Sequence, residues 1–106
     1  MINVVIVDDH PMFRTGIRMY IESKCEDICV TAEAESGEEL LRLPELAIVN
    51  QVLLDIELPG MNGIETARRL KSMYPEMKIL IISAIVIFRP SFMIRLVRYK
   101  GSPISA

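Results

Sequence analysis

Three aspartates stand directly after apolar runs, in places where their carboxylates could act together. Asp8 and Asp9 follow the run 2–7, and Asp55 follows the run 52–54. The carboxyl ends of neighbouring strands in a parallel sheet meet at one edge, so the three carboxylates are expected to lie close together. Like charges that close disfavour each other's ionisation, and a hard cation that prefers oxygen ligands relieves the repulsion. The spacing therefore predicts a Mg²⁺ site at one end of a sheet.

Predicted strands and helices alternate along the segments that must position these aspartates. Four short apolar runs predict buried strands. Between them, Pro11 suits the first turn of a helix. Ser36 and Glu39 have capping-box spacing before a second, short helix, and Asn62 can cap a third. The predicted strands cover 2–7, 28–32, 48–55 and 78–83. The order β-α-β-α-β-α-β predicts an α/β protein with helices on both faces of a parallel sheet.

Composition and charge narrow the class of protein. The 106 residues, 51% of them hydrophobic, suffice for one folded domain. All 14 acidic residues precede residue 77, whereas residues 77–106 carry 5 basic residues and no acidic one. The longest uncharged apolar run, 79–88, is about half as long as the roughly 20 residues that cross a bilayer. Cys25 and Cys29 lack the spacing of a redox or zinc pair, which favours reduced thiols in a cytoplasmic protein. We expect no signal peptide, no membrane partner and no nucleic acid bound by this domain.

Three motifs, each at the end of an apolar run, carry a family resemblance. They are Val7-Asp8-Asp9-His10-Pro11, Leu54-Asp55-Ile56-Glu57-Leu58-Pro59-Gly60-Met61-Asn62-Gly63 and Ile82-Ser83-Ala84. Together, at these spacings, they resemble the receiver domain of two-component response regulators over residues 1–84. The Asp-Asp-His-Pro start resembles the subfamily whose receivers precede a LuxR-type helix-turn-helix domain. The resemblance implies a flavodoxin-like parallel sheet with the strand order 2-1-3-4.

The resemblance also implies a phosphorelay function. Asp55 would be the phosphoacceptor, a nucleophile that takes a phosphoryl group from a histidine kinase or a phosphotransfer protein. Mg²⁺ would be held by Asp8, Asp9 and Asp55, together with the backbone carbonyl of Glu57. The hydroxyl of Ser83 would contact the phosphoryl group. Phosphoryl transfer depends on positioning and charge neutralisation more than on covalent chemistry from the protein. The resemblance implies a signalling phosphoprotein, not an enzyme. Homodimerisation is an open alternative to a monomer.

The sequence departs from the family pattern after the third motif. Receivers carry a lysine at the end of a fifth strand, but Ser105 and Ala106 stand near that place, and Lys100 lies in a loop-like segment. The fifth strand and fifth helix are therefore expected to be missing or malformed. The domain is divided into a receiver core at 1–84 and an atypical basic tail at 85–106, for which we hypothesise a truncated or frameshifted origin. Losing one preorganised charge donor costs about 2.7–4 kcal/mol of transition-state stabilisation, so phosphorylation is expected to be impaired.

Two other functions are consistent with the residues. The first is a phosphorylation-inert, receiver-like module that binds a protein partner through its first helix. The second is a Mg²⁺-dependent phosphatase with an aspartyl nucleophile. Such enzymes typically place a second aspartate two residues after the nucleophile, where this chain has Glu57, and this disfavours the phosphatase. His10 is interpreted as a residue of the helix start and not as a catalyst.

Overall fold

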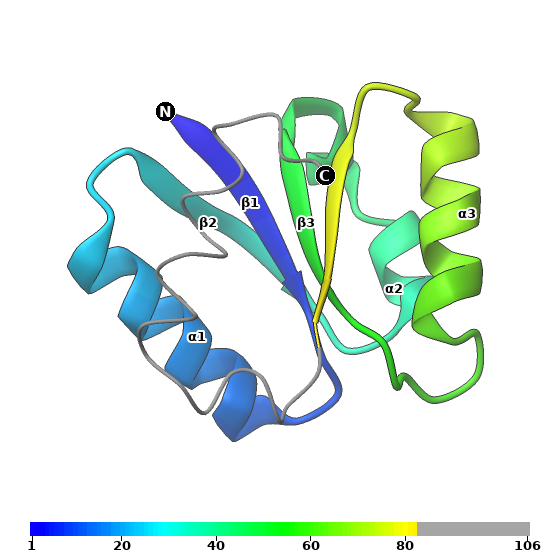
Figure 1. Cartoon of the computed structure of the whole chain (residues 1–106), viewed down its shortest axis with the longest axis horizontal. Coiled ribbons are helices and arrows are strands. Elements are labelled where there is room, and N and C mark those ends of the chain that lie inside the picture. The colour runs from blue at the N-terminus through cyan, green and yellow to red at the C-terminus, as the bar shows by residue number, and fades with distance from the viewer. Residues whose placement is uncertain (83–106) are drawn as a thin grey trace.

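The computed structural model describes residues 1–82, which form one parallel sheet flanked by helices (Figure 1). The strands are β1 (Ile2–Val7), β2 (Ile28–Ala34), β3 (Gln51–Asp55) and β4 (Lys78–Ile82), and they pair in the order β2-β1-β3-β4. The helices are α1 (Pro11–Lys24), α2 (Gly37–Leu41) and α3 (Gly63–Met73), with a 3₁₀ helix, η1, at Pro44–Ile48. This order confirms the predicted flavodoxin-like α/β fold. The tail at 85–106, with the predicted loss of a fifth strand and helix, lies outside the described residues.

Strand β1 is buried on both faces, because α1 covers one face of the sheet while α2 and α3 cover the other (Figure 1). Val4 and Ile6 pack in the cluster that includes α1, and the alternating Val5 and Val7 pack in the cluster that includes α2 and α3. All four are at most 2% exposed. A strand that is buried on both faces favours apolar residues. The first acidic residue, Asp8, comes directly after its carboxyl end. Within residues 1–82, no helix is long and apolar enough to span a bilayer.

Strand β3 begins at Gln51, and the predicted start at residue 48 is wrong. Ile48 is the last residue of η1 instead, and Val49 follows that helix in an extended conformation. Asn50, just before β3, links the amino ends of the neighbouring strands β1 and β4. Its Oδ1 accepts a hydrogen bond from the N–H of Asn3 at 2.8 Å, and its carbonyl accepts one from the N–H of Lys78 at 3.2 Å. An apolar run alone does not separate a 3₁₀ helix from a strand, which explains the error.

Helix α2 begins with the predicted cap. Ser36 Oγ accepts a hydrogen bond from the N–H of Glu39 at 3.0 Å, and Glu39 Oε1 accepts one from the N–H of Glu35 at 2.7 Å. We expect Ser36→Ala to lower the free energy of unfolding by about 1 kcal/mol, because it leaves an amide of the first turn without its partner. Urea denaturation of the full chain measures the loss. Ser23→Ala, at an exposed hydroxyl that donates to the Tyr20 carbonyl, should change the value by less than about 0.5 kcal/mol. Equal losses in both variants would contradict the capping role.

Candidate metal centre

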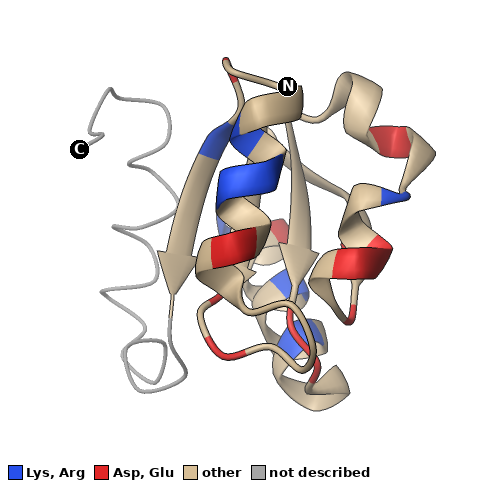
Figure 2. Ribbon diagram, turned by 90° about the vertical axis from the view of Figure 1, so that its right-hand side faces the viewer, with Lys and Arg blue, Asp and Glu red and all other residues tan. Residues whose placement is uncertain are grey.

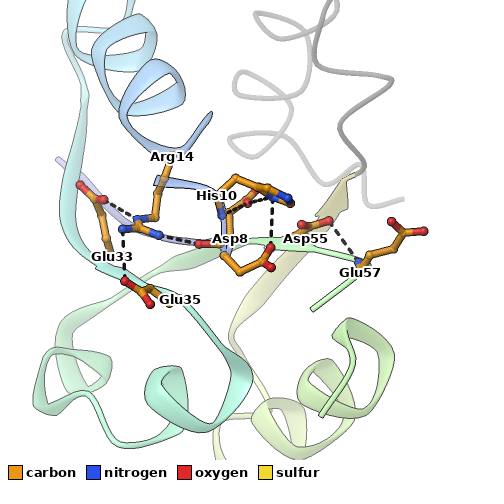
Figure 3. Close-up of polar contacts among 8 residues, drawn as sticks. Asp8, His10, Arg14, Glu33, Glu35, Asp55 and Glu57 are labelled. Atoms are coloured by element: carbon orange, nitrogen blue, oxygen red, sulfur yellow. Dashed lines mark hydrogen bonds and ion pairs between the residues drawn. The ribbon is translucent and has the colours of Figure 1, made fainter. Parts of the chain in front are cut away.

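The carboxyl ends of β1 and β3 lie side by side because these strands pair in parallel at the centre of the sheet. Asp8 follows β1 directly, and Asp55 is the last residue of β3. One oxygen each from Asp8, Asp9 and Asp55, and one ring nitrogen of His10, all lie within 4.8 Å of one another. Figure 2 shows acidic residues in the loops beyond the arrowheads of the strands, and Figure 3 shows Asp8, His10 and Asp55 together. The structure thus brings together the three aspartates that their spacing had placed at one edge.

Burial makes this group of carboxylates electrostatically costly. Asp8 is 2% exposed and Asp55 is 6% exposed. Burial raises the pKa of Asp55, and this effect exceeds the opposing hydrogen bond from the N–H of Glu57. The negative charges of Asp8 and Asp9 raise the pKa of Asp55 further. The fold therefore disfavours the negative charge on Asp55, and a cation bound among the carboxylates would favour it.

The loop after β3 orients the Asp55 side chain. Asp55 Oδ1 accepts a hydrogen bond from the N–H of Glu57 at 3.1 Å (Figure 3). Glu38, in α2, holds the same loop further along, because its Oε2 accepts a hydrogen bond from the N–H of Met61 at 3.2 Å. Between these contacts Gly60 has a φ of 69°, a conformation that glycine adopts without steric cost. The turn cluster predicted here therefore contributes a fixed loop next to the carboxylate.

His10 contacts the acidic pair, which sequence reasoning missed. Its Nδ1 lies 2.9 Å from Oδ1 of Asp8 and 3.1 Å from Oδ1 of Asp9. Its backbone N–H also donates to Oδ1 of Asp8 at 2.8 Å. The side-chain hydrogen bond with Asp8 raises the pKa of His10, and the charge of Asp9 raises it further. His10 is indeed the residue that precedes α1, but its side chain makes no capping hydrogen bond. Its position next to two aspartates was the available signal.

The donor set fits a hard divalent cation. Carboxylate oxygens are the ligands that Mg²⁺ prefers, and Mg²⁺ usually keeps places for water and phosphate. The Oδ1 atom of Asp9 is buried and, although it lies near His10, no hydrogen bond reaches it from residues 1–82. Apart from its contact with His10 Nδ1 at 3.1 Å, this buried oxygen has no polar partner among residues 1–82, so a cation could supply one. The metal contact from the Glu57 carbonyl stays a prediction, and Ser83, the predicted phosphoryl contact, lies outside the described residues.

Fold and site together define a flavodoxin-like α/β domain whose acidic site lies at the carboxyl edge of its central strands. A family model described as the response regulator receiver domain matches residues 4–86. The chain therefore belongs to the response regulator receiver family. This confirms the family that the three motifs predicted.

Sequence similarity to curated response regulators supports this family assignment. The nitrate/nitrite response regulator NarL of Escherichia coli K12 is 44% identical over 68 residues, which cover 64% of this chain and 31% of NarL. The transcriptional regulatory protein DegU of Brevibacillus brevis is 38% identical over 82 residues, covering 77% of this chain and 34% of DegU. The chain thus spans about a third of the length of these curated relatives.

Solved structures show the same fold. The receiver domain of a putative NarL from Mycobacterium tuberculosis superposes with a TM-score of 0.70 at 30% identity, covering 92% of this chain and 76% of that one. A structure of the RcsB response regulator of Salmonella typhimurium superposes with a TM-score of 0.81 at 21% identity, covering 94% and 60%. At 21% sequence identity, the similarity to RcsB supports the fold alone.

Proposed function

We propose that this domain is a phosphorelay receiver that accepts a phosphoryl group on Asp55 from a histidine kinase or a phosphotransfer protein, with Mg²⁺ bound beside it. The observation that carries the proposal is the convergence of Asp8, Asp9 and Asp55, whose oxygens lie within 4.8 Å of one another at the edge of the sheet. Membership of the receiver family supports the reaction class.

Asp55 has a separate role from Asp8 and Asp9 in the proposed phosphoryl transfer. Asp55 supplies the nucleophilic oxygen, and the hydrogen bond from the Glu57 N–H to its Oδ1 leaves Oδ2 to attack phosphorus. A P–O bond to Asp55 forms as the P–N bond to the donor histidine breaks, and the imidazole leaves with the electron pair of that bond. Asp8 and Asp9, with Asp55, would hold Mg²⁺, which supplies charge neutralisation for the carboxylates and the phosphoryl oxygens.

A small phosphodonor tests the proposal without requiring the cognate kinase. The full chain is incubated with acetyl phosphate, with Mg²⁺ or with excess chelator, and its intact mass is measured. We expect the mass of one phosphoryl group to be added in the presence of Mg²⁺ and no adduct in the chelator, because the carboxylate cluster then keeps its repulsion. Beryllofluoride, which mimics a bound phosphoryl group, should raise the thermal midpoint under the same Mg²⁺ condition.

The same measurements separate the alternatives. The departures from the family sequence at 85–106 favour a phosphorylation-inert binding module as the second candidate. Mg²⁺ binding without any adduct would support that module and contradict the phosphorelay function. Steady turnover of a small phosphoester would instead support the phosphatase, which we do not expect.

The cellular setting is also part of the proposal. DegU is named a transcriptional regulatory protein, and this chain matches about a third of it. We place the receiver in the cytoplasm, downstream of a histidine kinase, and we assign any DNA binding to a separate output domain of the regulator.

A further inference from the structure

Arg14, in helix α1, lies next to Asp8 and links this helix to β2 and to the end of β1. Its side chain is 13% exposed, and the guanidinium contacts three residues outside α1: Asp8, Glu33 and Glu35 (Figure 3). Nε donates to Oε1 of Glu33 at 2.7 Å, in β2. Nη1 donates to the backbone carbonyl of Asp8 at 2.6 Å, and Nη2 lies 3.9 Å from Oε2 of Glu35. The planar fork of the guanidinium thus connects β2 with the first residue of the metal site.

The contact to Asp8 fixes a peptide group that the site depends on. The N–H of Asp8 donates to the carbonyl of Ala34 at 3.0 Å, so β2 holds the amide side of this residue. Arg14 holds the carbonyl side through a charge-assisted hydrogen bond, which is roughly twice as strong as a neutral one. That carbonyl belongs to the peptide group from which Asp9 begins. Its orientation therefore constrains the position of the Asp9 backbone, from which the carboxylate extends.

Arg18 offers a natural comparison one turn further along α1. Its Nε lies 2.7 Å from Oε2 of Glu33, so both arginines pair with the same carboxylate. Arg14 differs by reaching the carbonyl of Asp8 as well. Loss of Arg14 leaves Glu33 paired with Arg18, which limits the structural damage and isolates the effect on the Asp8 peptide.

We propose that Arg14 is a positioning residue for the Mg²⁺ site, acting through the backbone carbonyl of Asp8. This inference rests on the proposed function. Partners one layer outside the ligands typically change metal affinity by 10- to 100-fold when they are removed. Arg14→Met is therefore expected to raise the Kd for Mg²⁺ about tenfold, whereas Arg18→Met should change it by less than about twofold.

The experiment compares the full-length wild type with Arg14→Met, Arg14→Lys and Arg18→Met. Mg²⁺ titration gives the Kd, and urea denaturation gives the stability of each variant. The amide resonance of Asp9, next to the carbonyl in question, gives a readout that does not need the metal. Arg14→Lys keeps the charge but not the fork, so it should also weaken Mg²⁺ binding and shift the Asp9 resonance. It serves as the test if Arg14→Met fails to fold.

The outcomes distinguish a failure of the proposed function from a failure of the positioning role of Arg14. A wild type that binds no Mg²⁺ overturns the proposed function itself. A wild type that binds Mg²⁺, with equal Kd changes in the Arg14 and Arg18 variants, overturns the positioning role. A selective loss of affinity in the Arg14 variants, with the Asp9 resonance shifted there and unchanged in Arg18→Met, supports it.

Discussion

Replacing Asp55 with Asn is expected to abolish the phosphoryl adduct, a loss on the order of a thousandfold or more, as for other covalent nucleophiles. An amide oxygen carries no negative charge and does not form the acyl phosphate. Asn has nearly the same shape, and its carbonyl oxygen can still accept the hydrogen bond that the Glu57 N–H gives to Oδ1. The test is the intact mass of the full chain after incubation with acetyl phosphate and Mg²⁺.

The same variant should be more stable than the wild type in the absence of Mg²⁺. The folded state raises the pKa of Asp55, chiefly through burial, so the folded protein binds this proton more tightly than the unfolded chain does. The ionised carboxylate therefore costs stability at neutral pH, and this cost grows as the pH rises from the ordinary carboxyl pKa to the raised one. The Asp55→Asn substitution removes this cost. Mg²⁺ should close the gap by stabilising the wild type more than the variant.

Glu76→Gln is a matched control for Asp55→Asn. It makes the same change from carboxylate to amide at an exposed residue before β4. We expect it to retain the adduct and to alter stability by less than about 0.5 kcal/mol. An adduct that persists in Asp55→Asn would place the phosphoacceptor elsewhere and contradict the assignment.

Gly63→Ala is expected to damage both the fold and the site. Gly63 is the first residue of α3, and its N–H donates to the Ile56 carbonyl at 3.2 Å. A Cβ atom there would clash with the carbonyl oxygen of Asp55 and would lie 2.8 Å from Cα of Ile56. These are main-chain atoms, so no change of rotamer relieves the clash, and either α3 or the end of β3 must shift. We expect the free energy of unfolding to fall by about 1–3 kcal/mol.

A shift of β3 also moves the proposed nucleophile. Misplacement of a reacting group by about 1 Å can cost on the order of 100-fold in rate, so phosphorylation by acetyl phosphate should slow by roughly 10- to 100-fold. Gly16→Ala is the control, because a Cβ atom at this exposed position in α1 meets nothing within 4 Å. It should stabilise the chain by about 0.4–1 kcal/mol and leave phosphorylation unchanged. Wild-type stability and rate in Gly63→Ala would show that the backbone absorbs the clash.

Much of the fold was predictable because local patterns agree with one another. The apolar run 2–7, the cap at Ser36 and the cap at Asn62 each appear where expected, and Asn62 Oδ1 accepts a hydrogen bond from the N–H of Glu65 at 2.9 Å. These signals depend on residues that are close together in the sequence. The error at the start of β3 arose where an apolar segment before Gln51 became a 3₁₀ helix, a choice that depends on what the segment packs against.

The sequence by itself determined the four strands and three α-helices of residues 1–82, their order, and the family with its three aspartates, because each follows from local periodicity or from motif spacing. Tertiary structure decided the rest. The 4.8 Å grouping of the aspartates exists because β1 and β3 pair in parallel, although the two strands are far apart in the sequence. The links from Arg14 to Asp8 and Glu33 exist because α1 packs beside β1 and β2. The contacts between β1 and β3 and between Arg14 and Glu33 join segments that are distant in the sequence, so no local pattern encodes them. The hydrogen bond from Arg14 to the Asp8 carbonyl spans only six residues, but it forms because α1 packs against the sheet.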